Sequence, residues 1–330
     1  MKHSTTTGHS FAFFGTFGLT LAGIACSATP ISSSTGLNGN GAAGFANSGQ
    51  GGGGTLFNTD SGNPNNGGAG NTNNVVQQDG SFLLHGIIRD FHKTYPDMEP
   101  CLNVPGKLCD SGHVEQNPTV SDPAENCGAG TAYPNSCFIA TTIGTDSKPV
   151  YVGKAGGTVT TTNANDFYYW FRTADPSANI NMEAPFALPL GANKDANGNP
   201  TGEYSYINDF FFPIDGQLFG NEGDTDQAVV NPKPHNYHFT TEFHLMFTYH
   251  TGQSFYFKGD DDLWVFIDGK LAVDRSGIHG AQDATLKLDD LGLVDAHDYQ
   301  FDLFYCERHV TLSEIAITTS MQFIDKPAIN

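Results

Sequence analysis

The chain has 330 residues, and 35 Asp and Glu against 15 Lys and Arg give it a formal net charge of −20. That charge argues against nucleic acid as a partner, because nucleic-acid binding needs a basic face, and it disfavours an anionic membrane surface for the same reason. The 39 glycines, 12% aromatic residues and only 15% charged residues are typical of β-structure with many turns.

The N-terminus has the pattern of an export signal. Residues 11–25 (FAFFGTFGLTLAGIA) are apolar over a length that suits a secretory signal and is short for a membrane span. The four residues that end at Cys26, Gly-Ile-Ala-Cys, resemble a bacterial lipoprotein processing site, with Gly23 where leucine is usual. We predict a signal peptide over residues 1–26. Two outcomes stay open: lipidation of Cys26 in an outer-membrane lipoprotein, or ordinary cleavage nearby and secretion.

Residues 27–80 predict a disordered tether. The segment is rich in Gly, Asn, Ser and Thr, and runs such as GQGGGG cannot build a core. A flexible chain of about 54 residues has an r.m.s. span of roughly 40 Å. Such a segment would hold a folded domain away from a surface, or would be a passive leader.

Five cysteines lie beyond the predicted signal peptide. Because export makes disulfides plausible, we predict the local pairs Cys101–Cys109 and Cys127–Cys137, while other pairings stay open. Each local pair would add about 2.5–3 kcal/mol to stability in the chain-entropy model. Cys306 lies in an apolar stretch (FDLFYCERH), which predicts a buried and unreactive thiol in a strand.

The strongest strand patterns lie in the last third of the chain. Apolar residues alternate with polar ones along residues 239–249, which predicts a strand with one face in water. Residues 263–267 are apolar throughout and predict a central strand. Further strands are predicted at residues 270–274, 299–305 and 315–323. Short strands with turn patterns between them predict a mainly β fold, an antiparallel β-sandwich.

Two other segments have ambiguous patterns. Residues 165–171 (NDFYYWF) fit a short helix or a strand, because their aromatic side chains match both periods. Residues 195–199 (DANGN) look like the start of a calcium loop. However, Pro200 replaces the required glycine and Tyr206 stands where the loop needs a glutamate. We therefore predict a hairpin turn at residues 195–199.

The most informative stretch reads GDDDLWVFIDGKLAVD. It places Asp260, Asp261 and Asp262 between two β-patterned runs, and the Asp-Gly pair at 268–269 predicts a tight hairpin turn. Three carboxylates on one short loop beside a rigid hairpin form an oxygen cluster that suits Ca²⁺. The alternative is a solvated acidic turn, although neighbouring carboxylates repel one another when no cation neutralises them.

Three other groups have a simpler interpretation than a functional one. Trp264 lies within a strand and is expected in the core rather than as a stacking surface for a sugar. Glu307, Arg308 and His309 resemble a catalytic set, but a salt bridge from Arg308 that anchors loops is the simpler account. No HExxH or CxxC pattern supports zinc at the neighbouring histidines His235, His238, His244 and His250.

Six motifs together resemble the fibro-slime domain family over residues 82–323. They are LHGIIRDFHKTYPD (84–97), FFPIDGQLFG (211–220), HNYHFTTEF (235–243), the acidic stretch above, IHGA (278–281) and LFYCERH (303–309). This domain is similar to the β-sandwich of the anthrax protective-antigen (PA-14) superfamily, which includes yeast flocculins and fungal adhesins. The resemblance implies a surface adhesion or sugar-binding module.

The same resemblance implies a calcium site. In calcium-dependent lectins of the superfamily, two consecutive aspartates joined by a cis peptide bond hold Ca²⁺, which binds sugar hydroxyls. The pair falls on Asp260 and Asp261, and Asp262 stands where relatives often have glycine. Asp262 would be a further ligand or an acceptor that supports the other two. An asparagine from a second loop also binds the ion in these lectins, and its counterpart cannot be placed from the sequence.

We therefore expect an exported adhesion module, at the cell surface or in the extracellular matrix, that binds glycans or matrix polysaccharide with Ca²⁺. Its membrane contact would be limited to a lipid on Cys26. A structural matrix protein that self-associates without a sugar site is the alternative. A glycan-active enzyme is a third class, but the sequence has no GxSxG, Walker or dinucleotide motif, so we expect no enzyme and assign no catalytic residue.

The predicted export has a direct test. The mature protein should begin at or near Cys26 and fractionate outside the cytoplasm, because residues 11–25 have the length and apolarity of a cleaved signal. N-terminal sequencing and membrane fractionation measure both. A soluble secreted product with a free N-terminus would remove only the lipid anchor, whereas an intact Met1 on cytoplasmic protein would contradict the prediction.

Overall fold

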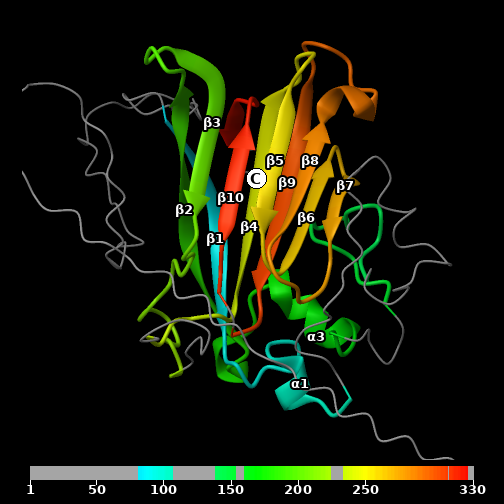
Figure 1. Cartoon of the computed structure of the whole chain (residues 1–330). Helices are drawn as coiled ribbons and strands as arrows, with labels where there is room; N and C mark the ends of the chain where they lie inside the picture. The colour runs from blue at the N-terminus through cyan, green and yellow to red at the C-terminus, as the bar shows by residue number, and fades with distance from the viewer. Residues whose placement is uncertain (1–80, 107–137, 154–159, 224–232, 311, 326–330) are drawn as a thin grey trace, which may run out of the picture. The chain divides into compact units, whose positions relative to one another are not determined.

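The computed structural model describes residues 81–106, 138–153, 160–223, 233–310 and 312–325 (Figure 1). The predicted signal peptide and tether at residues 1–80 lie outside these ranges. No helix in the described ranges is long and apolar enough to cross a membrane.

The described residues form eleven antiparallel strands in one continuous hydrogen-bonded order, which divides at strand β2 into two sheets (Figure 1). The first sheet has the order β7-β6-β9-β4-β1-β2, with β11 paired to β4. Its strands are β1 (Phe82–Phe91), β2 (Asn181–Lys194), β4 (Phe239–Thr248), β6 (Asp262–Ile267), β7 (Lys270–Arg275), β9 (Asp298–Glu307) and β11 (Phe323–Asp325). The second sheet has the order β3-β10-β5-β8. Its strands are β3 (Pro200–Asn208), β10 (Ile315–Thr319), β5 (Ser254–Gly259) and β8 (Gln282–Lys287).

Strand β2 joins the two sheets. Residues 181–190 pair with β1 in the first sheet, and residues 191–194 pair with β3 in the second. The turn between β2 and β3 is the one predicted at residues 195–199, where the Asp195 carboxylate accepts hydrogen bonds from the backbone amides of Asn197 and Asn199. The antiparallel β-sandwich predicted from the sequence is confirmed.

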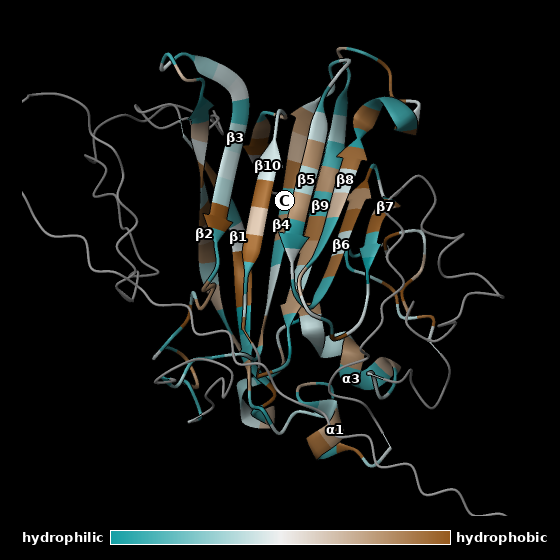
Figure 2. Cartoon of the chain, viewed as in Figure 1, coloured by the Kyte–Doolittle hydropathy of each residue, from teal (hydrophilic) through white to brown (hydrophobic). Residues whose placement is uncertain are grey.

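The main hydrophobic core fills the space between the sheets. Every second residue of the strands points into it, as the period of two requires. In β10 these residues are Ile315 and Ile317, and in β9 they are Phe301, Leu303 and Tyr305, all at most 3% exposed. Figure 2 shows the resulting change between apolar and polar colouring along the strands. This core fixes the strand ends from which the loops project.

A second cluster of aromatic side chains covers the outer face of the first sheet. Strand β6 contributes Val265 to the main core and Trp264 to this second cluster, so both faces of β6 are buried, as its sequence predicted. Trp170 and Phe171 pack against Trp264 from the segment after α3. Trp264 is fully buried, and it is therefore the core residue that was predicted. Cys306 lies in the same cluster, and burial raises the pKa of its thiol well above the usual value.

The helical segments are short and gather mainly at one end of the sheets (Figure 1). They are α1 (Pro100–Asn103), α3 (Ala164–Tyr168) and the 3₁₀ turns η1 (Tyr169–Phe171), η2 (Pro176–Ala178) and η3 (Leu288–Leu291). Of the two structures that fitted residues 165–171, the helix is the one that forms. The side chain of Asn163 caps α3 by accepting hydrogen bonds from the backbone amides of Asn165 and Asp166.

Two predictions about strands were wrong in part. The even positions of β4 do not all face water: Thr240 and Glu242 are fully buried, because the segment after α3 covers that face and the Thr240 hydroxyl donates to the Trp170 carbonyl. The predicted strand at 315–323 is two strands, β10 and β11, with different partners. The chain leaves the second sheet after Thr319 and joins the first at Phe323.

A buried ionic network explains the polar residues on the outer face of β4. The Glu242 carboxylate contacts Arg89 at 3.0 Å, Lys148 at 2.5 Å and His244 at 3.5 Å. The other nitrogen of His244 lies 2.7 Å from the carboxylate of Asp302, which is fully buried. Burial disfavours the charged imidazole, but the hydrogen bonds to Asp302 and Glu242 raise the pKa of His244 above its usual value.

This network predicts a pH-dependent contribution of His244 to stability. Because the pKa is higher in the folded protein, the stabilisation is fully present below the unfolded value of about 6.5 and is lost as pH rises through the folded value. The free energy of unfolding of the wild type should therefore exceed that of His244→Gln by more at pH 6 than at pH 9. Denaturant titration of both proteins measures the difference. If the difference in unfolding free energy between the wild type and His244→Gln stays constant or grows as pH rises, the raised pKa of His244 is contradicted.

Candidate metal centre

The acidic loop crosses from one sheet to the other. Strand β5 of the second sheet ends at Gly259 and strand β6 of the first sheet begins at Asp262, so only Asp260 and Asp261 connect them. The peptide bond between these two residues is cis, as the resemblance to the calcium-dependent lectins implied. All three aspartates are at most 4% exposed. The loop is therefore an internal connection rather than a solvated turn.

Backbone amides from three other segments hold the first two carboxylates. Asp260 accepts a hydrogen bond of 2.8 Å from the amide of Glu314, which precedes β10. Asp261 accepts bonds of 3.0 Å from the amides of His279 and Arg308, one on each carboxylate oxygen. These contacts fix the orientation of both carboxylates without supplying a compensating full charge.

Asp262 has different partners and a different role. Its two oxygens accept hydrogen bonds from the Gly277 amide at 2.5 Å and from the guanidinium of Arg308 at 2.6 Å. The Arg308 guanidinium also donates to the carbonyls of Asp97 and Thr160 and lies over the ring of Trp170. The predicted salt bridge that anchors loops is thus present, with Asp262 as its acceptor. Both roles predicted for Asp262 toward a cation, further ligand or supporting acceptor, stay predictions.

Glu307 adds a further buried carboxylate beside the loop. Its side chain is 1% exposed and accepts a hydrogen bond of 3.2 Å from the Tyr305 hydroxyl. Burial, together with the charges of Asp261 and Asp260, raises the pKa of Glu307 well above its usual value. Burial likewise raises the pKa of Asp260 to about 7 and the pKa of Asp261 well above the usual range, although Arg308 counteracts the shift at Asp261.

These carboxylates can bind a hard cation, but side chains alone do not complete a site. Within the described ranges, no group of three or more His, Cys, Asp or Glu side chains is arranged to hold a metal ion. A cation here would have to combine the two loop carboxylates with backbone carbonyl oxygens and water, which is a ligand set that Ca²⁺ accepts.

The neighbouring residues of the centre were only partly predictable. His279 belongs to the IHGA motif and Arg308 to the CERH motif, so the sequence marked both segments without giving their contacts. Glu314 was not predicted from the sequence, because it contacts Asp260 through its backbone amide and the residue type does not reveal such a contact. The four histidines considered for zinc pair with different acids: His235 with Asp215, His238 with Glu99, His244 with Glu242 and Asp302, and His250 with Asp295.

The predicted disulfides are only partly within the described ranges. Cys101 is disulfide-bonded. Cys109, Cys127 and Cys137 lie outside the described residues, as does the predicted lipidation site Cys26. The local pairings therefore stay predictions.

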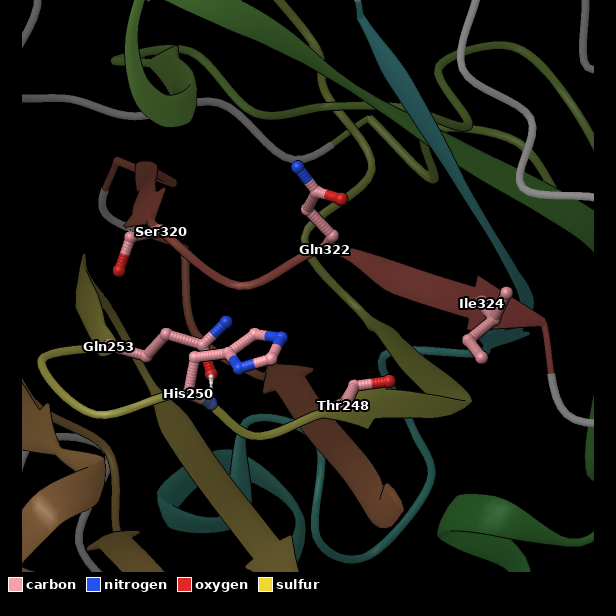
Figure 3. A pocket seen from close by; sticks show the side chains of 6 residues that line it. All are labelled: Thr248, His250, Gln253, Ser320, Gln322 and Ile324. Carbon is pink, nitrogen blue, oxygen red and sulfur yellow. Dashed lines mark hydrogen bonds between the residues drawn. The ribbon is translucent and has the colours of Figure 1, made fainter. Parts of the chain in front are cut away.

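A separate pocket lies at the opposite end of β5, where β4 turns into β5 (Figure 3). It has a volume of about 480 Å³. Figure 3 shows the lining side chains in two groups, one from the end of β4 and the β4–β5 turn, the other from the segment after β10 and from β11. The lining residues are Thr248, His250, Gln253, Ser320, Gln322 and Ile324. Apart from the titratable imidazole of His250, this lining is uncharged.

Comparison with known families gives a match in the C-terminal part of the sandwich. Residues 198–327 match the family model of the PA14 domain. Over these residues the chain is similar to the PA14 domain family. The predicted similarity to the protective-antigen superfamily is confirmed, while the fibro-slime name stays a prediction. Strands β1 and β2 lie before the matched range, although they pair within the same sheets.

The chain is similar to several proteins of Dictyostelium discoideum. It is 40% identical to protein psiQ over 189 residues, which cover 56% of this chain and 18% of psiQ. It is 38% identical to protein psiD over 191 residues, which cover 55% of this chain and 35% of psiD. The chain therefore matches only about a fifth to a third of these relatives.

Two solved PA14 structures are weakly similar. The PA14 sugar-binding domain from an RTX adhesin has 12% identity and a TM-score of 0.22, covering 40% of this chain and 81% of that one. The PA14 domain of the MpAFP antifreeze protein has 9% identity and a TM-score of 0.21, covering 39% and 75%. At these scores the two structures add nothing to the fold described above.

The salt bridge between Arg308 and Asp262 predicts a large effect on stability. Both side chains are fully buried, so Arg308→Ala should lower the free energy of unfolding by about 3–5 kcal/mol by leaving Asp262 without its partner. Arg172→Ala is the matched control, because Arg172 pairs with the half-exposed Asp146 and should cost about 1 kcal/mol or less.

Denaturant titration of both variants measures the difference. Replacing both charges, as Arg308→Met with Asp262→Leu, should recover part of the loss even if Arg308→Ala does not fold, because neither member of this ion pair is then left buried alone. Equal losses for Arg308→Ala and Arg172→Ala would contradict the anchoring role.

Proposed function

We propose that this protein is an exported adhesion module whose PA14-like domain binds carbohydrate through Ca²⁺ held at Asp260 and Asp261. The observation that carries the proposal is the buried pair Asp260 and Asp261, each at most 4% exposed and held by backbone amides, with the buried carboxylate of Glu307 beside them. Burying several carboxylates together is costly unless a positive charge neutralises them. A divalent cation would provide that charge.

The donor set fits calcium better than a transition metal. Both loop residues offer carboxylate oxygens, and each oxygen keeps a lone pair beyond the one used by its backbone hydrogen bond. Nitrogen and sulfur donors favour zinc, but Cys306 is buried with its pKa raised, and the backbone of His279 rather than its ring contacts the loop. Oxygen ligands of this kind suit Ca²⁺.

The chain's own residues orient the site. The amides of Glu314, His279 and Arg308 fix the two carboxylates, and the Arg308–Asp262 pair holds the start of β6 in place. When bound, Ca²⁺ would supply coordination positions for the hydroxyl groups of a sugar. Because the loop is fixed by several hydrogen bonds, little ordering would be needed when the ion binds.

The choice of carbohydrate as ligand is supported by the match to the PA14 domain and by the resemblance of the acidic loop to calcium-dependent lectins. A location outside the cytoplasm is supported by the apolar residues 11–25 and the Gly-rich segment that follows. The partners we propose are extracellular glycans or matrix polysaccharide.

Calcium should stabilise the fold. Extracellular calcium modules bind with dissociation constants of about 10⁻⁴–10⁻³ M, and at 100 times that constant the stabilisation is about 2.7 kcal/mol. Asp261→Asn should lose most of the calcium-dependent rise in melting temperature. Without metal this variant loses one repelling charge but also one of the two backbone hydrogen bonds that Asp261 accepts, so the two effects offset each other and its melting temperature should stay close to that of the wild type. Calorimetry in calcium and in chelator measures both effects.

The matched control is Asp268→Asn in the nearby hairpin. Asp268 is exposed and has a positive φ of 50°, which asparagine also tolerates, so this variant should keep the full calcium response. If the wild type melts at one temperature in both buffers, the calcium site is refuted. If calcium stabilises the wild type but no glycan binds on an array, the self-associating matrix protein becomes the better account.

A further inference from the structure

The polar pocket at the other end of β5 from the carboxylate loop has no part in the proposed function. Its volume of about 480 Å³ lies within the range of small-molecule sites. The end of β4, the β4–β5 turn, the segment after β10 and strand β11 line it (Figure 3). Both sheets therefore contribute to the pocket, because β4 and β11 belong to the first sheet and β10 to the second.

Hydrogen bonds fix the β4–β5 turn on one side of the pocket. The Asp289 carboxylate accepts from the Gly252 amide at 2.8 Å and from the Tyr249 hydroxyl at 2.7 Å. Within the turn, the His250 amide donates to the side-chain oxygen of Gln253 at 2.8 Å (Figure 3). The carboxamide of Gln253 is therefore oriented by the turn itself, so little freedom is lost when a ligand binds to it.

Core packing fixes the other side of the pocket. Met321 and Phe323 are at most 4% exposed and belong to the main core. Side chains alternate along an extended segment, so Gln322 and Ile324 point the other way, where both line the pocket. The segment after β10 thus presents a carboxamide and an apolar side chain from a backbone that the core holds in place.

The lining keeps both donors and acceptors for a ligand. Gln253 uses its side-chain oxygen in the turn, and both of its side-chain N–H groups are without partners in the described part of the chain. The Ser320 oxygen accepts from the Ser254 amide at 3.0 Å, which leaves the hydroxyl proton for a ligand. The Thr248 hydroxyl donates to the Asp298 carboxylate at 2.7 Å and keeps its oxygen as an acceptor.

This combination favours a neutral ligand that is rich in hydroxyl groups. An anion only accepts hydrogen bonds and an ammonium group only donates them, whereas a hydroxyl does both. The carboxylates of Asp295, 3.6 Å from the His250 ring, and of Asp298 contact the lining and would repel an anion. Ile324 is the apolar residue of the lining, so the pocket offers little to the apolar side chains of a peptide.

We propose that this pocket is a second binding site, which takes a neutral saccharide and needs no metal ion. The carboxamides of Gln253 and Gln322 would bind the hydroxyl groups at the edge of a sugar ring, and Ile324 would cover the C–H groups of one face. The carboxylate loop takes no part in this binding. Together with the proposed calcium site, a second site at the other end of the sandwich would let one chain join two glycans.

The test is ligand-observed NMR with the full chain in chelator. The probes are maltose, cellobiose and lactose, with triglycine as the peptide probe. The wild type should bind at least one disaccharide. Gln322→Ala and Gln322→Glu should each bind it about 10-fold more weakly, because both remove the side-chain N–H donors. Gln217→Ala is the matched control and should bind normally, because its loop is held by Asp90 near the start of β4, whereas the pocket lies at the end of β4.

Melting temperatures measured in chelator separate binding from folding. Both Gln322 variants should melt with the wild type, because this side chain is exposed. If they bind the disaccharide as well as the wild type, if their weaker binding comes with a lower melting temperature, or if Gln217→Ala loses binding equally, the inference is wrong. Binding of triglycine alone, or of no probe without calcium, would also overturn it. The proposed function is then untouched, because its own tests are made in calcium.

Discussion

The burial of several acidic side chains around one arginine is the constraint on which the site depends. Asp260, Asp261 and Asp262 occupy the crossing between the two sheets, and Arg308 neutralises only the last of them directly. Within the described residues no ion pair compensates the first two aspartates, and burial raises the pKa of both carboxyl groups. A cation is the simplest way to resolve this imbalance, because hydrogen bonds from neutral amides cannot supply a full charge.

The rest of the fold makes this crossing rigid. Strand β2 belongs to both sheets, so the sheets cannot easily separate, and the aromatic cluster around Trp264 covers the outer face of β6. Arg308 links the loop to the carbonyls of Asp97 and Thr160, far away in the sequence. The helical segments are too short to be stable alone, and their contribution is to cover the end of the first sheet. A rigid support of this kind is what a preorganised ligand site needs.

Local patterns made much of this predictable, and long-range contacts account for the rest. The β6–β7 hairpin, the core position of Trp264 and the acidic loop follow from the order of residues in one stretch. The burial of Glu242 could not be predicted, because its partners Arg89 and Lys148 come from distant segments. The alternation of apolar and polar residues in β4 therefore predicted a face in water, but another part of the chain packs against that face. The hydrogen bond from the Glu314 amide to Asp260 could not be predicted for a related reason, because a backbone donor does not depend on the side chain.

A crystal structure grown in millimolar calcium, with anomalous data collected at long wavelength, tests the central claim most directly. The account predicts one anomalous peak per chain in contact with carboxylate oxygens of both Asp260 and Asp261, with Asp262 still bound to Arg308. A loop in the same conformation with only water between the carboxylates, and no anomalous peak, would contradict it.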